Sequence, residues 1–232
     1  GTAFDSTTMS VDSIKLTAKW QAMIVFETNG GTDVTDISQP QGTKITLPNT
    51  EKASYMFAGW YDESGQKYID SAMPSVSVKL YAKYWKIEKI IKVLIDETSS
   101  YYVYDRTSPS VDSYCKELDL GEIFNNGVRE IVVTAHYQAK ASYGTTSKPQ
   151  YMYVTWYSVK TASDAYKLWQ IEDKHIDSNW ATYTEKTKIS LSSSKVYLSF
   201  WAVGFNIYNS HYKPYWKDYY LEIEYPNMSK LY

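Results

Sequence analysis

Apolar and polar residues alternate along much of this chain, which is the pattern of β-strands with one buried face. Residues 22–28 (AMIVFET) alternate in this way and lead into Asn29-Gly30-Gly31, residues that tolerate the positive φ of a tight turn. A helix over residues 33–39 is only weakly indicated. Further strands are predicted in this part of the chain at 44–47, 55–61, 67–69 and 76–84.

The chain contains an internal repeat. Residues 1–20 align without a gap on residues 65–84, at an offset of 64 positions. A fixed period of this size indicates an array of modules, so we expect the chain to be part of a longer protein. The identical pairs are Gly1 and Gly65, Met9 and Met73, Ser13 and Ser77, Lys15 and Lys79, Leu16 and Leu80, Ala18 and Ala82, and Lys19 and Lys83.

A set of short motifs occurs in one order and spacing: Phe26 with Asn29-Gly30-Gly31, then Leu47-Pro48, residues 55–57, Gly59-Trp60-Tyr61 and residues 80–83. With these motifs, residues 1–84 resemble the Listeria–Bacteroides repeat, the internalin B-repeat family of bacterial surface proteins. The chain departs from the family at Ser54, usually Gly, and at Tyr84, usually Trp. The resemblance implies a small β-grasp-like module that is used in tandem outside the cell, as a stalk or an adhesive unit. We expect Trp60 to form its core.

Strand patterns continue beyond residue 85. Residues 86–95 have the apolar spacing of a helix, but they are β-branched and follow a predicted strand directly, so a strand is favoured. A short helix is predicted at 163–171. Many short strands with few helical signals favour an antiparallel β-sandwich or jelly roll. The further strands are predicted at 101–104, 116–120, 129–138, 150–160, 188–191, 195–205 and 218–225.

The expected fold class is therefore all-β with minor α: a β-grasp-like repeat followed by an antiparallel β-sandwich or jelly-roll domain. Residues 1–20 are interpreted as the C-terminal tail of a preceding repeat and residues 21–84 as one complete repeat. Residues 85–232 are interpreted as a Tyr/Trp-rich β-sandwich domain, for which the sequence indicates no family.

Composition narrows the function. The chain has 24 Tyr and 8 Trp against 6 Phe, and tyrosine suits surfaces that are half wetted. A net charge of −2 gives no basic surface for nucleic acid. No run of 18 apolar residues occurs, so we expect no membrane-spanning segment. The single cysteine, Cys115, is expected to be a packing residue.

Candidate binding residues come from strand faces and from one loop. In residues 150–160 one face (Met152, Val154, Trp156) is the expected core, which leaves tyrosines on the other. Residues 206–216 are expected to form an aromatic loop, and Trp180 is the best single stacking candidate. Sugar sites combine flat rings with hydrogen-bonding groups; the alternatives are a solvated tyrosine-rich face and a loop folded onto the sandwich edge. The candidate ligand-binding residues are Trp180, Tyr208, His211, Tyr212, Tyr215, Trp216, Tyr151, Tyr153 and Tyr157.

The sequence contains no convincing arrangement of catalytic residues. Glu222 and Glu224 would lie side by side on one strand face, unlike the separated carboxylates of a glycosidase. Asp173, His175 and Asp177 lack a fourth partner for a metal. We therefore predict no catalytic residues, no metal and no cofactor.

The expected function is that of a non-catalytic segment of a bacterial cell-surface protein, located outside the cell. Its repeats would act as a stalk, and its C-terminal sandwich would bind a glycan or a host-surface protein. The alternatives are a structural spacer without a ligand and, less favoured, a glycan-active enzyme.

Overall fold

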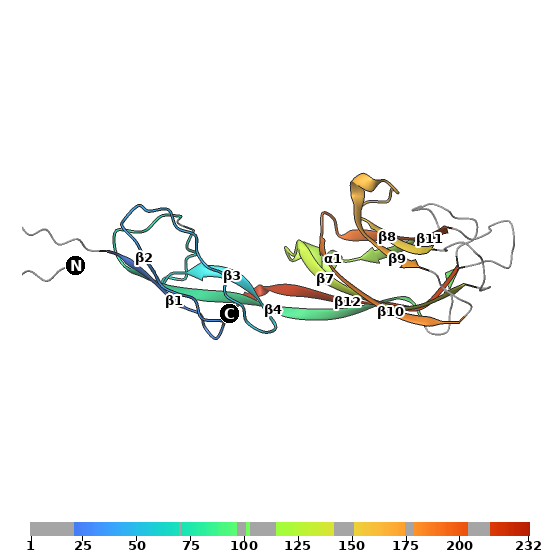
Figure 1. The fold of residues 1–232 in the computed structure, drawn as a ribbon, viewed down its shortest axis with the longest axis horizontal. Coiled ribbons are helices and arrows are strands. Elements are labelled where there is room, and N and C mark those ends of the chain that lie inside the picture. The colour runs from blue at the N-terminus through green and yellow to red at the C-terminus, as the bar shows by residue number, and fades with distance from the viewer. Residues whose placement is uncertain are drawn as a thin grey trace, which may run out of the picture. The chain divides into compact units, whose positions relative to one another are not determined.

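The computed structural model describes residues 21–69, 71–96, 101–102, 115–141, 151–174, 179–203 and 214–232 (Figure 1). Almost all regular structure in these residues is β, which confirms the all-β prediction. The chain divides into two compact units. The second comprises Lys52–Ala58 and Tyr84–Tyr232, and the first comprises the rest of the chain.

The first unit is built on β1 (Met23–Glu27) and the beginning of β4 (Val78–Ile95). These strands pair in parallel, with Ile24 opposite Val78. On its other side β1 pairs antiparallel with β2 (Ile37–Ser38), so the helix predicted over residues 33–39 is wrong. The physical reason is visible at Asp36, whose carboxylate accepts a hydrogen bond from the Phe26 backbone N–H at 3.0 Å and holds this segment against β1.

Trp60 forms the core of the first unit, as predicted. It lies in β3 (Tyr55–Tyr61), which pairs with β4, and its side chain is 2% exposed. The indole Nε1 donates to the Pro48 carbonyl at 2.7 Å, and the ring centroid lies 4.6 Å from that of Phe26. The strands predicted at 44–47 and 67–69 are reduced to single bridges, Lys44 with Ala72 and Tyr61 with Lys67.

In the second unit, residues 86–95 continue β4 as a strand, so the helical alternative is wrong. They pair antiparallel with β12 (Pro214–Leu231), where Ile90 lies opposite Ile223. Next to β12 lies β7 (Glu130–Ala141), and next to β7 lies β10 (Ala181–Ser190). The short β5 (Tyr101–Tyr102) also pairs with β12. Figure 1 shows β4 and β12 running side by side.

A second antiparallel sheet has the order β6-β11-β8-β9. Its strands are β6 (Lys116–Asp119), β11 (Lys195–Val203), β8 (Tyr151–Tyr157) and β9 (Lys167–Lys174). The helix α1 (Gly121–Asn125) follows β6. The helix predicted at 163–171 is wrong beyond one 3₁₀ turn (Asp164–Tyr166), because the residues after it pair with β8 as β9.

The core of the second unit lies between these two sheets. Alternate residues of β7 are buried there, and so, as the sequence predicted, are Met152, Val154 and Trp156 of β8. Strands β11 and β12 contribute, among others, Phe200 and Leu221. Strands β7, β11 and β12, and residues 151–154 of β8, therefore place alternate side chains in the core and the others on the outer side.

Strand β12 begins at Pro214, earlier than predicted, so Tyr215 and Trp216 are strand residues and not loop residues. A β-bulge lies between Lys217 and Tyr220, where two residues of β12 oppose Tyr137 of β7. Asp218 occupies this bulge with a φ of 50°. A bulge adds one residue and so reverses which alternate side chains face the core.

Candidate functional site

The structure separates the predicted binding residues. Tyr208, His211 and Tyr212 lie outside the described residues. Trp216 and Tyr157 are buried, at 0% and 1% exposure, and therefore cannot present a ring to a ligand. The remaining four divide between the outward faces of the two sheets. Tyr151 and Tyr153 lie on one, and Trp180 and Tyr215 lie on the other.

Trp216 is a core residue because of the bulge at Asp218. Strict alternation back from the buried Leu221 would place Tyr215 in the core. Because the bulge adds one residue, Trp216 lies in the core instead. There its ring meets Phe200 of β11 edge to face, with centroids 5.2 Å apart. The prediction of Trp216 as an exposed stacking platform is therefore wrong.

Tyr157 is buried where β8 ends. A register shift between β8 and β9 lies beside it, since Trp156 pairs with Trp169 and Tyr157 with Lys167. The next residue, Ser158, donates its backbone N–H to the Tyr166 carbonyl at 2.9 Å, so the chain folds back at this point. Burial is also the main cause of the raised pKa of the Tyr157 hydroxyl. The prediction of Tyr157 as a ligand contact is wrong.

Tyr151, Tyr153 and Trp201 form a row of rings on the outward side of the second sheet, and we call these three residues the aromatic face. Tyr153 of β8 pairs directly with Trp201 of β11. Their rings are stacked, with centroids 4.1 Å apart and an interplanar angle of 13°. Tyr151 lies 6.2 Å from Tyr153 at 25°. All three side chains are half-buried, so each keeps part of its ring in contact with solvent.

Polar groups adjoin the aromatic face. The Trp201 indole Nε1 donates to the Thr155 hydroxyl at 2.9 Å, and Thr155 in turn donates to the side-chain oxygen of Gln170 at 3.3 Å. Glu172 of β9 lies opposite Tyr153, and its side chain is exposed. Burial first, and then the charge of Glu172, raises the pKa of the Tyr153 hydroxyl. Apolar rings thus lie beside an amide, a carboxylate and a hydroxyl.

Sequence reasoning missed Trp201, although a usable signal was present. Residues 196, 198, 200 and 202 of β11 are the buried set, so strand alternation turns Trp201 outward. The prediction for residues 195–205 gave the strand but did not separate its two faces. Its pairing with Tyr153 depends on the register between β8 and β11, which local sequence does not encode.

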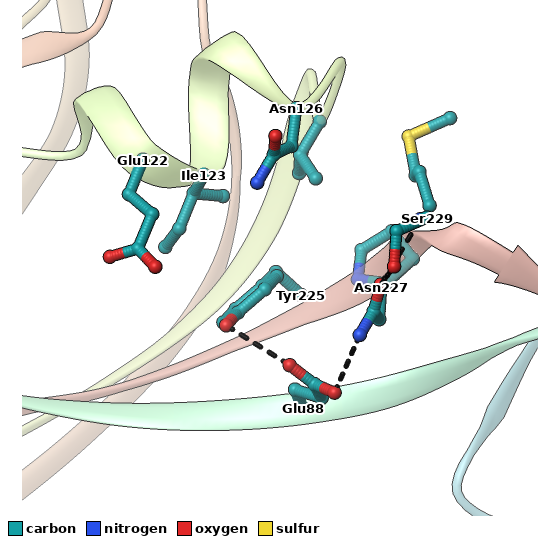
Figure 2. A pocket seen from close by; sticks show the side chains of 10 residues that line it. Glu88, Glu122, Ile123, Asn126, Tyr225, Asn227 and Ser229 are labelled. Carbon is teal, nitrogen blue, oxygen red and sulfur yellow. Dashed lines mark hydrogen bonds between the residues drawn. The ribbon is translucent and has the colours of Figure 1, made fainter.

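A polar pocket of about 170 Å³ lies under α1 (Figure 2). It lies beside a long irregularity in β12, where Pro226 pairs with Ile87 but the next pair is Leu231 with Trp85. Glu88 accepts hydrogen bonds from the Asn227 amide at 2.7 Å and from the Tyr225 hydroxyl at 3.3 Å. Burial, followed by the negative charge of Glu88, raises the pKa of Tyr225. Because Glu88 already has two donors, the aromatic face is the stronger candidate for ligand binding.

In the ranges that the structure describes, no group of three or more His, Cys, Asp or Glu side chains is placed to hold a metal ion. Nor does any described helix have the length and apolar character needed to cross a bilayer.

Part of the chain matches a known family. Residues 23–83 match the Listeria-Bacteroides repeat domain. The resemblance predicted from the sequence motifs is therefore confirmed over these residues.

Two relatives come from Evansella cellulosilytica. One, named "Putative Gly-rich membrane protein", is 36% identical over 92 residues, which cover 37% of this chain and 10% of that protein. The other, named "Putative membrane protein", is 38% identical over 85 residues, covering 34% of this chain and 13% of that protein. The matched part thus spans about a tenth of the length of these relatives.

Among solved structures, a chain of the T13 IBDV viral particle covers 87% of this chain and 41% of its own length. The sequence identity is 8% and the TM-score is 0.38.

Proposed function

We propose that this chain is a non-catalytic part of a bacterial cell-surface protein and that its second unit binds a glycan through the aromatic face. The Listeria-Bacteroides repeat would then be a β-grasp-like spacer that holds the binding unit outside the cell. The match of residues 23–83 to this repeat supports a surface location, as do relatives that are named membrane proteins.

The observation that carries the proposal is the stacked pair Tyr153 and Trp201 on an outward sheet face. A pyranose has an apolar C–H face that fits against an aromatic ring and hydroxyls that need hydrogen-bond partners. Gln170 and Glu172, which lie on the neighbouring strand of the same sheet, are suited to provide those partners. Stacked rings also stabilise a sheet that binds no ligand. The experiment must therefore distinguish a glycan-binding face from a spacer without a ligand.

The test is a glycan array followed by titration of the best neutral glycan against three variants. Trp201→Ala and Tyr153→Ala are each expected to weaken binding by about 1–3 kcal/mol, the range measured for stacking of bases on aromatic side chains. Tyr220→Ala is the matched control, because Tyr220 is a half-buried tyrosine stacked on His136 at 4.7 Å in the other sheet. This variant should bind normally.

Melting temperatures of the same variants show whether each remains folded. If no glycan on the array is bound, or if Trp201→Ala and Tyr153→Ala bind as tightly as the unaltered protein, the aromatic face is not a sugar site and the spacer function stands.

A further inference from the structure

A second cluster lies on the outward side of the sheet that contains β7, β10 and β12. Trp180, the residue before β10, lies beside Lys140 of β7 and Lys217 of β12. The Nζ atoms of both lysines are 4.7 Å from the centroid of the Trp180 ring. The Lys140 ammonium is also 5.8 Å from the ring centroid of Tyr215. Three strands thus bring two cations and two aromatic rings together.

Strand register places these four side chains on one face. Ala139 and Trp216 are buried at 0% exposure, so their neighbours Lys140, Tyr215 and Lys217 point outward. Lys140 pairs with Tyr215 across β7 and β12, and Ala181 pairs with Ala139 across β10 and β7. Trp180 precedes Ala181 and is half-buried. The bulge at Asp218 fixes the orientation of Tyr215 and Lys217.

The charges on this sheet face are not distributed evenly. Farther along the same sheet, lysines are neutralised by glutamates. Lys89 lies 2.7 Å from Glu222, Lys186 lies 3.6 Å from Glu224, and Lys188 lies 2.6 Å from Glu130. Within the described part of the chain, Lys140 has no carboxylate partner. Among the described residues, the carboxylate nearest Lys217 is that of Asp218, at a long 3.9 Å, and its Oδ2 also accepts a hydrogen bond from the Gln138 amide at 2.8 Å.

The ammonium groups of Lys140 and Lys217 each lie 4.7 Å from the centroid of the Trp180 ring. The distance between them is therefore at most roughly twice this value, and they repel each other weakly. Attraction to the indole holds each of them there. An anion between them would remove the repulsion and gain charge-assisted hydrogen bonds. The arrangement is therefore a preformed pair of cations that is only partly neutralised by the protein itself.

We propose that Trp180, Lys140 and Lys217 form a binding site for a carbohydrate that carries a carboxylate or a sulfate group. The anionic group lies between the two ammonium groups, and an apolar face of the sugar packs on Trp180 or Tyr215. The site is on the opposite sheet from the aromatic face and does not depend on the proposed function of that face.

A nucleic acid fits this surface less well. Binding along a phosphate backbone needs a stripe of uncompensated cations. Here Glu222 and Glu224 follow on the same face of β12, and the whole chain carries a net charge of −2. Two lysines are enough for the single anionic group of a sugar residue.

The experiment is a calorimetric titration of the whole chain with four probes. A hyaluronan oligosaccharide carries carboxylates, a heparin oligosaccharide carries sulfates as well, dextran is neutral, and a single-stranded thymidine oligonucleotide provides phosphates without sugar acids. At least one acidic oligosaccharide should bind, and its affinity should fall as salt is raised. Dextran and the oligonucleotide should bind at least about 10-fold more weakly.

Variants locate the site. Lys140→Gln and Lys217→Gln should each weaken binding of the acidic oligosaccharide by about 5-fold or more, because each removes one charge-assisted contact. Trp180→Ala should weaken it by a similar factor. Lys186→Gln is the matched control, since Lys186 is an exposed lysine on the same sheet with a glutamate partner. It should leave the affinity unchanged, as should Trp201→Ala on the other sheet.

The proposal is overturned if neither acidic oligosaccharide binds, if the oligonucleotide binds as tightly, if Trp201→Ala, in which the aromatic face is altered, binds dextran as tightly as it binds the acidic oligosaccharide, or if Lys186→Gln has the same effect as Lys140→Gln. Should Trp180→Ala fail to fold, the two lysine variants still decide the question, because both side chains lie on the outward sheet face. Loss of acidic-sugar binding in Trp201→Ala alone would move the site to the aromatic face.

Discussion

Trp216 and Phe200 join the two sheets of the second unit through an edge-to-face contact, with ring centroids 5.2 Å apart and planes at 74°. Trp216 comes from β12 and Phe200 from β11. Both side chains are buried, and Phe200 makes a similar contact with Tyr219 at 5.4 Å. Tyr215 and Lys217, the neighbours of Trp216, face outward. One short stretch of β12 therefore contributes both to the core and to the cluster around Trp180.

Replacing Trp216 should therefore damage the fold. We expect Trp216→Ala to lower the free energy of unfolding by about 3–5 kcal/mol, the usual cost of removing a buried large aromatic ring. Trp156→Ala, which alters the same core, should lower the free energy of unfolding by a similar amount. Tyr215→Ala is the adjacent control and should cost much less, because Tyr215 lies on the outward face. Urea unfolding followed by circular dichroism measures all three. Equal stability of Trp216→Ala and Tyr215→Ala would contradict the burial of Trp216.

The contrast between β8 and β12 shows what the sequence could predict. In β8 the core residues Met152, Val154 and Trp156 alternate along the strand, and their burial was predicted correctly, although Tyr157, predicted on the other face, is buried as well. In β12 the bulge at Asp218 breaks the alternation. A one-residue insertion exchanges the two faces, and no local pattern marks it. Trp216 was therefore predicted on the wrong side.

The aromatic face and the cluster around Trp180 could be predicted only in part. Four of their aromatic residues were named from sequence: Tyr151 and Tyr153 as the second face of a strand, Tyr215 as part of an aromatic loop, and Trp180 as a stacking candidate. Their partners Trp201, Lys140 and Lys217 were not. Trp201 and Tyr153 are brought together by the register between strands that are far apart in the chain. Such pairings depend on how the whole sheet assembles, and the periodicity within one strand carries no information about this assembly.

The turn-and-strand motif of the repeat gives a second prediction. Gly59 has a φ of 127°, and a Cβ atom there would lie 2.7 Å from Cε of Lys67. The lysine side chain can move away, but the backbone conformation remains strained for any L-residue. Gly59→Ala should therefore lower the free energy of unfolding by about 1–3 kcal/mol.

Gly42→Ala is the matched control. Gly42 has a φ of 77°, in the left-handed region that non-glycine residues can still enter, and a Cβ atom there meets nothing within 4 Å. Thermal unfolding should show a clearly smaller loss for Gly42→Ala than for Gly59→Ala. If adding Lys67→Ala to Gly59→Ala restored full stability, steric contact and not backbone strain would be the cause.

The third prediction concerns pH and the ion pair of Lys89 with Glu222, whose charged atoms are 2.7 Å apart. The hydrogen bond from Lys89 is the main cause that lowers the pKa of Glu222 below its ordinary 4.5, with smaller contributions from the charges of Lys89, His136 and Lys186. The same hydrogen bond raises the pKa of Lys89 above 10.5. A lowered carboxyl pKa gives stability that is present above the unfolded value and is lost as pH falls through the folded value. A raised amine pKa gives stability that is lost as pH rises through the folded value.

Lys89→Met should therefore reduce the melting temperature most between about pH 5 and pH 10, with the difference from the unaltered protein closing at both extremes. The reduction should be small, because the side chain of Lys89 is 45% exposed and surface pairs contribute little. Carboxyl titration by NMR should show the pKa of Glu222 moving up toward its ordinary value in Lys89→Met, but not fully, since His136 and Lys186 remain nearby. Lys230→Met is the control, because in the described residues Lys230 contacts the Tyr232 ring and has no carboxylate partner. A melting-temperature difference for Lys89→Met that stayed constant from pH 7 down to about pH 3 would show that Glu222 does not stabilise the fold through this pair.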